Sequence, residues 1–328
     1  MNRRDHIKAL SATVIAAALP SWPAFGQAKY PQSPIRLIVP YAPGGVVDAV
    51  ARNWAERMNK PLGTIVVDNR GGGGGTIGAT AVAHATPDGY TLLFGDTSSQ
   101  IIAPSLMLNP PYDTAKDFTA VSMIATSSTA IVVHPSVPAM NLAEFIKYAQ
   151  HPDKPLSYAS AGSGTVTNLA GELFKQLIKA PDIQHVPYRG AGPGLIDLIA
   201  GVVPMMTPNV TSQVLGFHRA GKVRILAVCA PARLKAAPDI PAAVETLPGM
   251  SVQLTAGVLA PAGTPAAIVD QIAAATAAAI KEPDFDRVLE AAGLEARSDA
   301  TPAGAQAFLV AERERLLPII KAAGLQQQ

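Results

Sequence analysis

Three glycine-rich stretches carry the groups best suited to binding chemistry: "PYAPGG" at 40–45, "SAGSGT" at 160–165 and "YRGAGPG" at 188–194. Each follows a predicted strand and precedes a segment with helical periodicity. The first amides of a helix lack an intrahelical acceptor, and the helix dipole places partial positive charge on them. Glycine lets the backbone turn so that such amides face a ligand. One such loop alone is an ordinary turn, but three in matching places predict an anion held by backbone N–H groups.

Other motifs argue against cofactor and catalytic chemistry. Gly73, Gly75 and Gly78 satisfy G-x-G-x-x-G, but they lie in a glycine run, and no acidic residue follows at a second strand end as a dinucleotide site requires. Ser163 misses the G-x-S-x-G motif by one residue. The histidines are scattered, and Cys229 is the single cysteine. We therefore expect no cofactor, no metal site and no enzyme activity.

The elements that position the first loop alternate in type. Strands are predicted over "IRLIVP", "TIVVDN" and "TLLFG", each ended by Pro, Asn or Gly. Between the first two, a helix is predicted with Asp48 and Arg52 on its outer face and Asp48 in a structural role in the first turn. Its inner face comprises Val47, Val50, Ala51, Trp54, Ala55 and Met58. Alternation of strand and helix predicts a parallel α/β sheet.

The same pattern restarts near residue 155. "LSYASAG", "IQHVPYRG", "VRILAVCA" and "VQLTAGVLAP" are predicted strands, and "TNLAGELFKQLI" and "PGLIDLIAG" are predicted helices. The tail is predicted helical over 265–281, 284–292 and 302–322. The chain therefore divides into two α/β lobes that are joined by more than one crossing.

The N-terminus predicts export. Arg3, Arg4 and Lys8 precede an apolar run that is too short to span a bilayer, and small residues near Ala28 offer a cleavage site. Both the general secretory and the twin-arginine routes stay open. Without residues 1–28, the 26 basic and 24 acidic residues become 23 of each, so no basic surface for nucleic acid is expected. We predict a soluble periplasmic protein.

Six segments together resemble one family: "PIRLIVPYAPGGVVDAVAR", "VDNRGGGGGTIGA", "TPDGYTLLFG", "YASAGSGTVTNLAGELF", "VPYRGAGPGLIDLIAG" and "APAGTP". Their order is similar to that in the extracytoplasmic receptors of tripartite tricarboxylate transporters, the Bug family. The resemblance implies a two-lobed periplasmic binding protein of type II topology that closes on a small carboxylate and delivers it to membrane transporter subunits. It also implies that the loops at 40–45 and 160–165 present amides to the ligand carboxylate.

Two departures from the family pattern bear on the ligand. Asn168 stands where family members commonly have His, and Pro208 and Asn209 stand where an Asp is frequent. Loss of that acid makes an amino acid ligand less favoured than a di- or tricarboxylate, or an aromatic acid with Tyr41 and Tyr188 beside its ring. Among these we favour a dicarboxylate.

These inferences define one set of predictions. Lobe one spans 29–126 plus 252–328, lobe two spans 127–251, and the ligand cleft lies between them. The hinge is expected to run through "MIATSSTAIVV" (123–133) and "VQLTAGVLAP" (252–261), and the protein is expected to be a monomer. Arg189 pairs with a second carboxylate, or else caps a helix or bridges the lobes. The alternative functions are an exported hydrolase that uses Ser163 and a ligand-sensing adaptor for a signalling protein. The predicted ligand contacts are Tyr41, Ala42, Gly44, Gly45, Thr97, Ser98, Ala161, Gly162, Ser163, Gly164, Thr165, Tyr188, Arg189 and Gly190.

Overall fold

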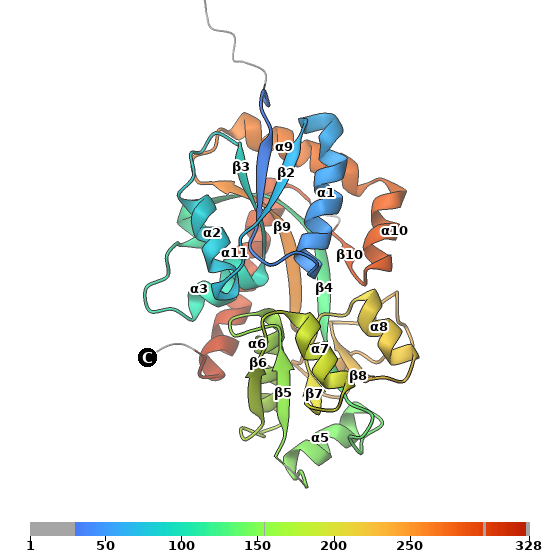
Figure 1. The fold of residues 1–328 in the computed structure, drawn as a ribbon. Coiled ribbons are helices and arrows are strands. Elements are labelled where there is room, and N and C mark those ends of the chain that lie inside the picture. The colour runs from blue at the N-terminus through green and yellow to red at the C-terminus, as the bar shows by residue number, and fades with distance from the viewer. Residues whose placement is uncertain (1–29, 154, 298–299, 326–328) are drawn as a thin grey trace, which may run out of the picture.

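The computed structural model describes residues 30–153, 155–297 and 300–325, which form two α/β lobes placed end to end (Figure 1). The predicted export segment 1–28 lies outside these residues. Within the described ranges, the model contains no helix of the length and apolar character that crossing a membrane requires.

Lobe one is built on a sheet that begins with three parallel strands. β1 (Ile35–Val39) lies between β2 (Ile65–Asn69) and β3 (Thr91–Asp96) and pairs with both in parallel. β9 (Gln253–Pro261), from late in the chain, pairs with β3 in the opposite direction. The carboxyl ends of β1 and β3 therefore point the same way, toward lobe two.

Helices cover this sheet as the apolar periodicity predicts. All six residues predicted for the inner face of the first helix are buried. Trp54 on that face donates its indole N–H to Thr276 Oγ1 at 3.0 Å, which ties the first helix to a helix of the tail. The helices of lobe one are α1 (Val46–Leu62), η1 (Gly73–Gly75), α2 (Thr76–Ala83), η2 (Ser98–Ile102), α3 (Ala103–Ser105), α4 (Thr114–Asp117), α9 (Ala266–Ile280), α10 (Pro283–Ala291) and α11 (Pro302–Ala322).

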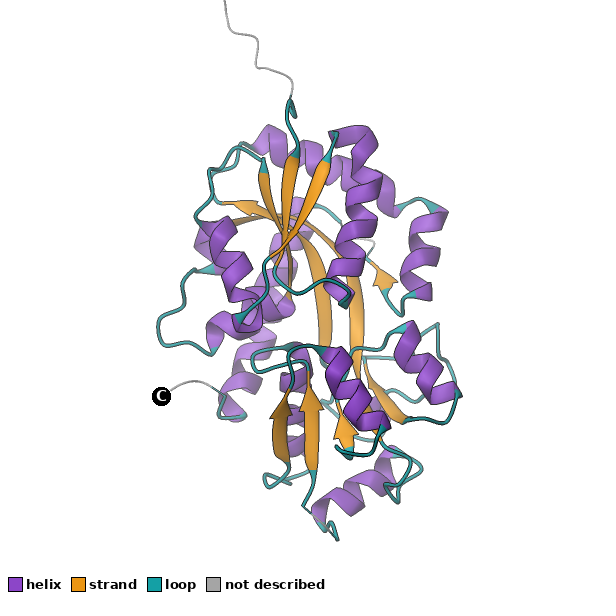
Figure 2. Cartoon of the chain, viewed as in Figure 1, coloured by secondary structure: helices purple, strands orange, loops and turns teal. Residues whose placement is uncertain are grey.

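One long strand, β4 (Phe118–Val133), is shared by both lobes (Figure 2). Its first part pairs with β9 as far as Ser128, and from Thr129 onward it pairs with β8 (Arg224–Cys229). The strands therefore form one hydrogen-bonded path rather than two separate sheets. The change of partner falls at 128–129, next to the predicted boundary at 126–127, and the position of the hinge itself stays a prediction.

Lobe two repeats the strand–helix order on a smaller sheet. β5 (Ser157–Ser160) pairs in parallel with β6 (Gln184–Pro187) and with the short β7 (Met205–Met206), and β7 joins β4. A short strand of lobe one, β10 (Glu295–Ala296), pairs with β4 on the edge away from β9. The elements of lobe two are α5 (Leu142–Gln150), β5 (Ser157–Ser160), α6 (Val166–Leu177), β6 (Gln184–Pro187), α7 (Ala191–Ile199), β7 (Met205–Met206), α8 (Ser212–Arg219), β8 and η3 (Ala243–Glu245).

Candidate ligand site between the lobes

The first glycine loop is held in place by Asp48, which corrects the predicted position of this side chain. Asp48 is buried rather than on an outer face, because the loop and Asn69 fold over it. Its carboxylate accepts from the Gly44 amide at 2.9 Å, from Asn69 Nδ2 at 2.9 Å and from Arg52 Nε at 3.0 Å. Burial raises the pKa of Asp48, but these hydrogen bonds outweigh it and hold the pKa below its ordinary value. The structural role predicted for Asp48 agrees with this geometry.

The start of α1 has no side-chain cap. Its N-cap is Gly45, and Gly44 before it has a φ of +86°, a conformation that favours glycine. Within the described residues, the amides of Gly45 and Val46 donate no hydrogen bond. Both are therefore open to an acceptor outside the helix.

Tyr41 points its hydroxyl into lobe one. It donates to Asp96 Oδ1 at 2.6 Å, and the same oxygen accepts from the amide and the hydroxyl of Ser99. Asp96 Oδ2 is buried and has no hydrogen-bond partner among the described residues. Burial raises the pKa of Asp96 and that of Tyr41. Tyr41 can therefore offer a ligand its ring but not its hydroxyl proton.

Ser98 joins the two lobes directly. Its Oγ accepts from the amide of Val166, the first residue of α6, at 3.1 Å. The neighbouring Thr97 is engaged differently, because its Oγ1 accepts from the Thr255 amide of β9 at 2.9 Å. Both residues are buried. Ser98 therefore lies at the junction between the lobes, whereas the Thr97 hydroxyl is bonded to β9. Contact of either residue with a ligand stays a prediction.

In the second glycine loop, most of the predicted amides point inward. The Ala161 amide donates to Thr167 Oγ1, the Gly162 amide to Ser160 Oγ and the Gly164 amide to Asn168 Oδ1. The amides of Ser163 and Thr165 donate no hydrogen bond within the part of the chain that the structure describes. These two amides are the ones that remain for a ligand.

The third loop lies beside the second. The Tyr188 amide donates to Ser160 O and the Gly190 amide to Ala161 O, both at 3.1 Å. The Tyr188 hydroxyl donates to Asp197 Oδ2 at 2.6 Å, and this bond raises the Tyr188 pKa to about 12. The side chain of Arg189 is exposed and forms no hydrogen bond or ion pair with any described residue. Gly190 caps α7 without a side chain, as Gly45 caps α1.

The glycine run at 71–75 forms part of the junction, which sequence reasoning missed. A Cβ added at Gly74 would lie 3.4 Å from Ser163 O and 3.5 Å from Gly164 O, so the run packs against the second loop across the lobes. The available signal is the run of five consecutive glycines, which no predicted ligand contact included. The lobes meet where the second loop faces three features of lobe one, namely the glycine run, the first loop and Ser98 (Figure 1).

Among the described residues, neither a histidine partner for Ser163 nor a cluster of metal ligands lies at this junction. No described histidine hydrogen-bonds to the Ser163 hydroxyl, and His185 contacts the buried Ser160 instead. The described ranges contain no group of three or more His, Cys, Asp or Glu residues placed to hold a metal ion.

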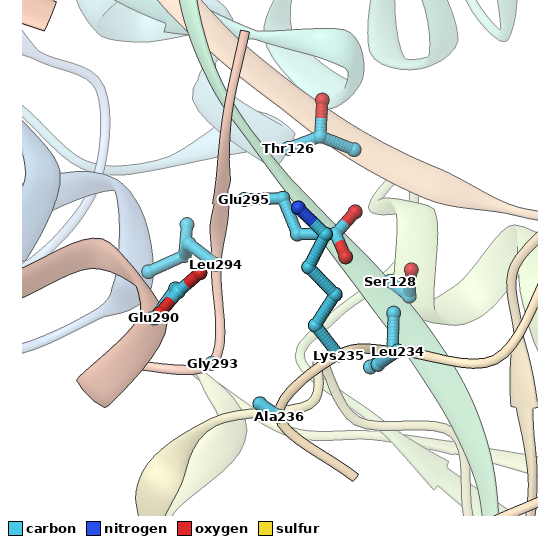
Figure 3. Close-up of a pocket in the computed structure, with 9 residues that line it drawn as sticks. All are labelled: Thr126, Ser128, Leu234, Lys235, Ala236, Glu290, Gly293, Leu294 and Glu295. Atoms are coloured by element: carbon cyan, nitrogen blue, oxygen red, sulfur yellow. The ribbon is translucent and has the colours of Figure 1, made fainter. Parts of the chain in front are cut away.

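A separate crevice lies at the β10 edge of β4 (Figure 3). None of the fourteen predicted contacts lines it, and no glycine-rich loop opens onto it. It is lined from both lobes by Thr126, Ser128, Leu234, Lys235, Ala236, Glu290, Gly293, Leu294 and Glu295.

Comparison with known sequences places relatives over almost the whole chain. A family model described as the tripartite tricarboxylate transporter family receptor matches residues 50–325. A protein from the tcbD–tcbE intergenic region of Pseudomonas sp. strain P51 is 37% identical and covers 89% of this chain and 86% of its own length. BugT of Bordetella pertussis is 35% identical and covers 73% of this chain and 74% of its own length.

Solved structures agree with this result. MatC from Rhodopseudomonas palustris with bound malate superimposes with a TM-score of 0.81 at 33% identity and covers 89% of this chain and 100% of its own. A second R. palustris protein, with adipate, has a TM-score of 0.83 at 32% identity and covers 90% of this chain and 98% of its own. The two-lobed fold predicted from the sequence is confirmed.

Proposed function

Because this chain belongs to the family of tripartite tricarboxylate transporter receptors that includes the Bug proteins, we propose that it captures a dicarboxylate between its lobes and delivers it to the membrane subunits of such a transporter. The proposed role is reversible binding without chemistry. Residues 1–28 would direct the chain to the periplasm, and sequencing the N-terminus of the exported protein would locate the cleavage site.

The observation that carries the proposal is the set of amides without partners at the junction. Gly45 and Val46 lie at the start of α1, and Ser163 and Thr165 lie just before α6. A carboxylate has two oxygens that each accept hydrogen bonds, and the helix dipoles favour its charge. Amides from opposite lobes can therefore hold one carboxylate only when the lobes are closed.

A second carboxylate has a candidate partner in Arg189. Its guanidinium is exposed, has no partner among the described residues and adjoins Gly190 at the start of α7. A planar guanidinium pairs well with a carboxylate in a two-pronged geometry. The malate and adipate in the two R. palustris structures are both dicarboxylates, which supports this choice of ligand class.

A thermal-shift screen tests the proposal. Malate, adipate, citrate, a benzene dicarboxylate, an amino acid and an uncharged sugar would each be added to the purified protein. A ligand at 100 times its Kd stabilises the folded state by about 2.7 kcal/mol, and a rise in Tm of several degrees follows. We expect the dicarboxylates to give the largest rise, and a rise with uncharged compounds only would contradict the proposal.

Gly45→Val tests the site itself. The backbone at Gly45 is extended, and an added Cβ would meet nothing closer than Ala42 O at 3.9 Å, so the variant should fold normally while its side chain covers the first amides of α1. The matched control is Gly216→Val on the exposed surface of α8, where an added Cβ also meets open space. We expect Gly45→Val to lose binding and Gly216→Val to keep it. Equal affinity in the two variants would remove the first loop from the site.

Delivery is tested separately from binding. Proteoliposomes that contain the transporter subunits should take up labelled dicarboxylate only when the receptor is present outside them. Binding without any such uptake would favour the sensing role over delivery.

A further inference from the structure

His185 lies directly beneath the second glycine loop. It is half-buried on β6, and its ring stacks on Tyr158 with centroids 4.9 Å apart and an interplanar angle of 21°. Its Nε2 is 2.7 Å from Ser160 Oγ, and its Nδ1 is 3.5 Å from Asn168 Nδ2. Ser160 and Asn168 are the side chains that accept the Gly162 and Gly164 amides of the loop.

The donors and acceptors of this network match only for a neutral ring. Asn168 uses its oxygen for the Gly164 amide at 3.2 Å, so its amino group faces the Tyr158 hydroxyl at 2.8 Å and His185 Nδ1. An amino group can only donate, so Nδ1 must be the unprotonated nitrogen. The ring proton then lies on Nε2 and is donated to Ser160 Oγ. Tyr158 is free to accept from Asn168 because its own proton goes to Glu172 Oε1 at 2.6 Å.

Protonation of the ring disrupts this match. A proton on Nδ1 faces the amino group of Asn168, and two donors then oppose each other. Rotation of the Asn168 amide removes that conflict, but it turns the amino group toward the Gly164 amide, which is also a donor. The Gly164 amide then loses its acceptor, and the loop that exposes the Ser163 and Thr165 amides loses its anchor.

We propose that His185 is a positioning residue that acts through Asn168 and Ser160 to set the amides of the 160–165 loop, so that ligand affinity falls when the ring is protonated. The effect on affinity rests on the proposed function, because it needs the proposed ligand. The coupling between the His185 ring and the Gly164 amide does not depend on that function. The expected change is an increase in Kd of about three- to tenfold, which corresponds to one lost hydrogen bond.

The surrounding groups determine the pH range. Burial lowers the pKa of His185, Glu172 raises it and Lys175 lowers it, and the net result lies below the ordinary value of 6.5. Glu172 and Lys175 form an ion pair at 2.9 Å, and Tyr158 is a further titratable group that packs against the ring. Because the folded pKa is the lower one, the neutral network is intact above pH 6.5 and is lost only at more acidic pH.

Nuclear magnetic resonance on the ligand-free chain tests the coupling. We expect the Gly164 amide signal to titrate with the same midpoint as the His185 ring, and the same titration to be present in the control variant His151→Gln, which alters an exposed histidine of lobe two. A Gly164 signal that does not respond to ring protonation would overturn the proposal. This readout needs no ligand, so it stands even if no carboxylate binds at any pH.

Calorimetry with malate then tests the effect on affinity. The ratio of Kd at a pH below the measured midpoint of the His185 titration to Kd at pH 7.5 should be about three- to tenfold larger in the wild type and in His151→Gln than in His185→Gln. The glutamine side chain of His185→Gln does not titrate. Proton uptake by malate itself is common to all three proteins and cancels in this comparison. Equal ratios would overturn the proposal, and if His185→Gln does not fold, the titration of the wild type decides.

Discussion

Replacement of Asp48 by alanine should show how far the first glycine loop depends on one buried carboxylate. The variant removes the acceptor of the Gly44 amide and of Asn69, each at 2.9 Å. A hydrogen bond to a charged group contributes about 1.5–3 kcal/mol. The pair with Arg52 adds about 0.5 kcal/mol or less, because the Arg52 side chain is 52% exposed.

The two hydrogen bonds and the Arg52 pair together predict a loss of about 3 to 6.5 kcal/mol in the free energy of unfolding for Asp48→Ala. With a urea dependence of about 3 kcal/mol/M, the unfolding midpoint should fall by about 1 to 2 M. The loop also loses the bond that fixes Gly44, so the dicarboxylate Kd should rise about tenfold, the equivalent of 1.4 kcal/mol. Urea unfolding followed by circular dichroism, together with calorimetry, measures both effects.

The pH dependence gives an independent check of the same reasoning. Hydrogen bonds outweigh burial and hold the pKa of Asp48 below 3.8. A carboxylate with a lowered folded pKa stabilises the fold above its unfolded pKa, and this contribution is lost as pH falls through the folded pKa. The stability difference between wild type and Asp48→Ala should therefore stay constant above about pH 5 and shrink below it.

The matched control is Glu56→Ala, which removes an exposed carboxylate from the same helix. Its urea midpoint and its ligand affinity should equal those of the wild type. If Asp48→Ala behaves like Glu56→Ala in both measurements, the loop does not depend on this carboxylate and the reasoning is refuted.

Three further substitutions follow from single contacts. Ser98→Ala removes the acceptor of the Val166 amide between the lobes. We therefore expect the free energy of unfolding to fall by about 1 kcal/mol and the radius of gyration in solution scattering to increase. An unchanged radius would contradict the role of this bond in closure. Gly171→Ala places a Cβ 2.0 Å from Tyr158 Cε2. The free energy of unfolding measured in urea should therefore fall by about 2 kcal/mol or more. A variant as stable as the wild type would show that the Tyr158 ring moves without cost. Arg189→Ala should change the free energy of unfolding by no more than about 0.5 kcal/mol. It should weaken the binding of a dicarboxylate about tenfold more than that of a monocarboxylate. Equal losses of affinity for the two ligands in calorimetry would exclude Arg189 as the partner of the second carboxylate.

Local patterns in the sequence were sufficient for most elements of the fold. The inner face of α1 was predicted residue by residue, because apolar spacing decides which side of a helix can be buried. The predicted tail helix 302–322 has the same bounds as α11, which Thr301 caps. Residues 142–150 carried no prediction, although Asn141 and Glu144 form the side-chain cap that starts α5.

Contacts between distant segments decided the rest. The 123–133 segment was expected only as a hinge, yet it belongs to one strand. Its pairing partners on β9 and β8 lie between 134 residues (Met123 to Gly257) and 91 residues (Val133 to Arg224) further along the chain. Strand pairing of this kind leaves no local signal, since each partner is chosen by the whole sheet. The path shared by the lobes was therefore not visible from spacing alone.

The site shows the same division. The sequence by itself determined that glycine-rich turns precede α1, α6 and α7, because glycine permits the positive φ that such turns use. Only the tertiary structure decided which amides remain for a ligand. Asp48 takes the Gly44 amide and Asn168 takes the Gly164 amide, while Ser98 takes the Val166 amide from the other lobe. An amide bonds to whichever acceptor the fold brings within about 3 Å, and that acceptor depends on packing rather than on the type of residue that carries the amide.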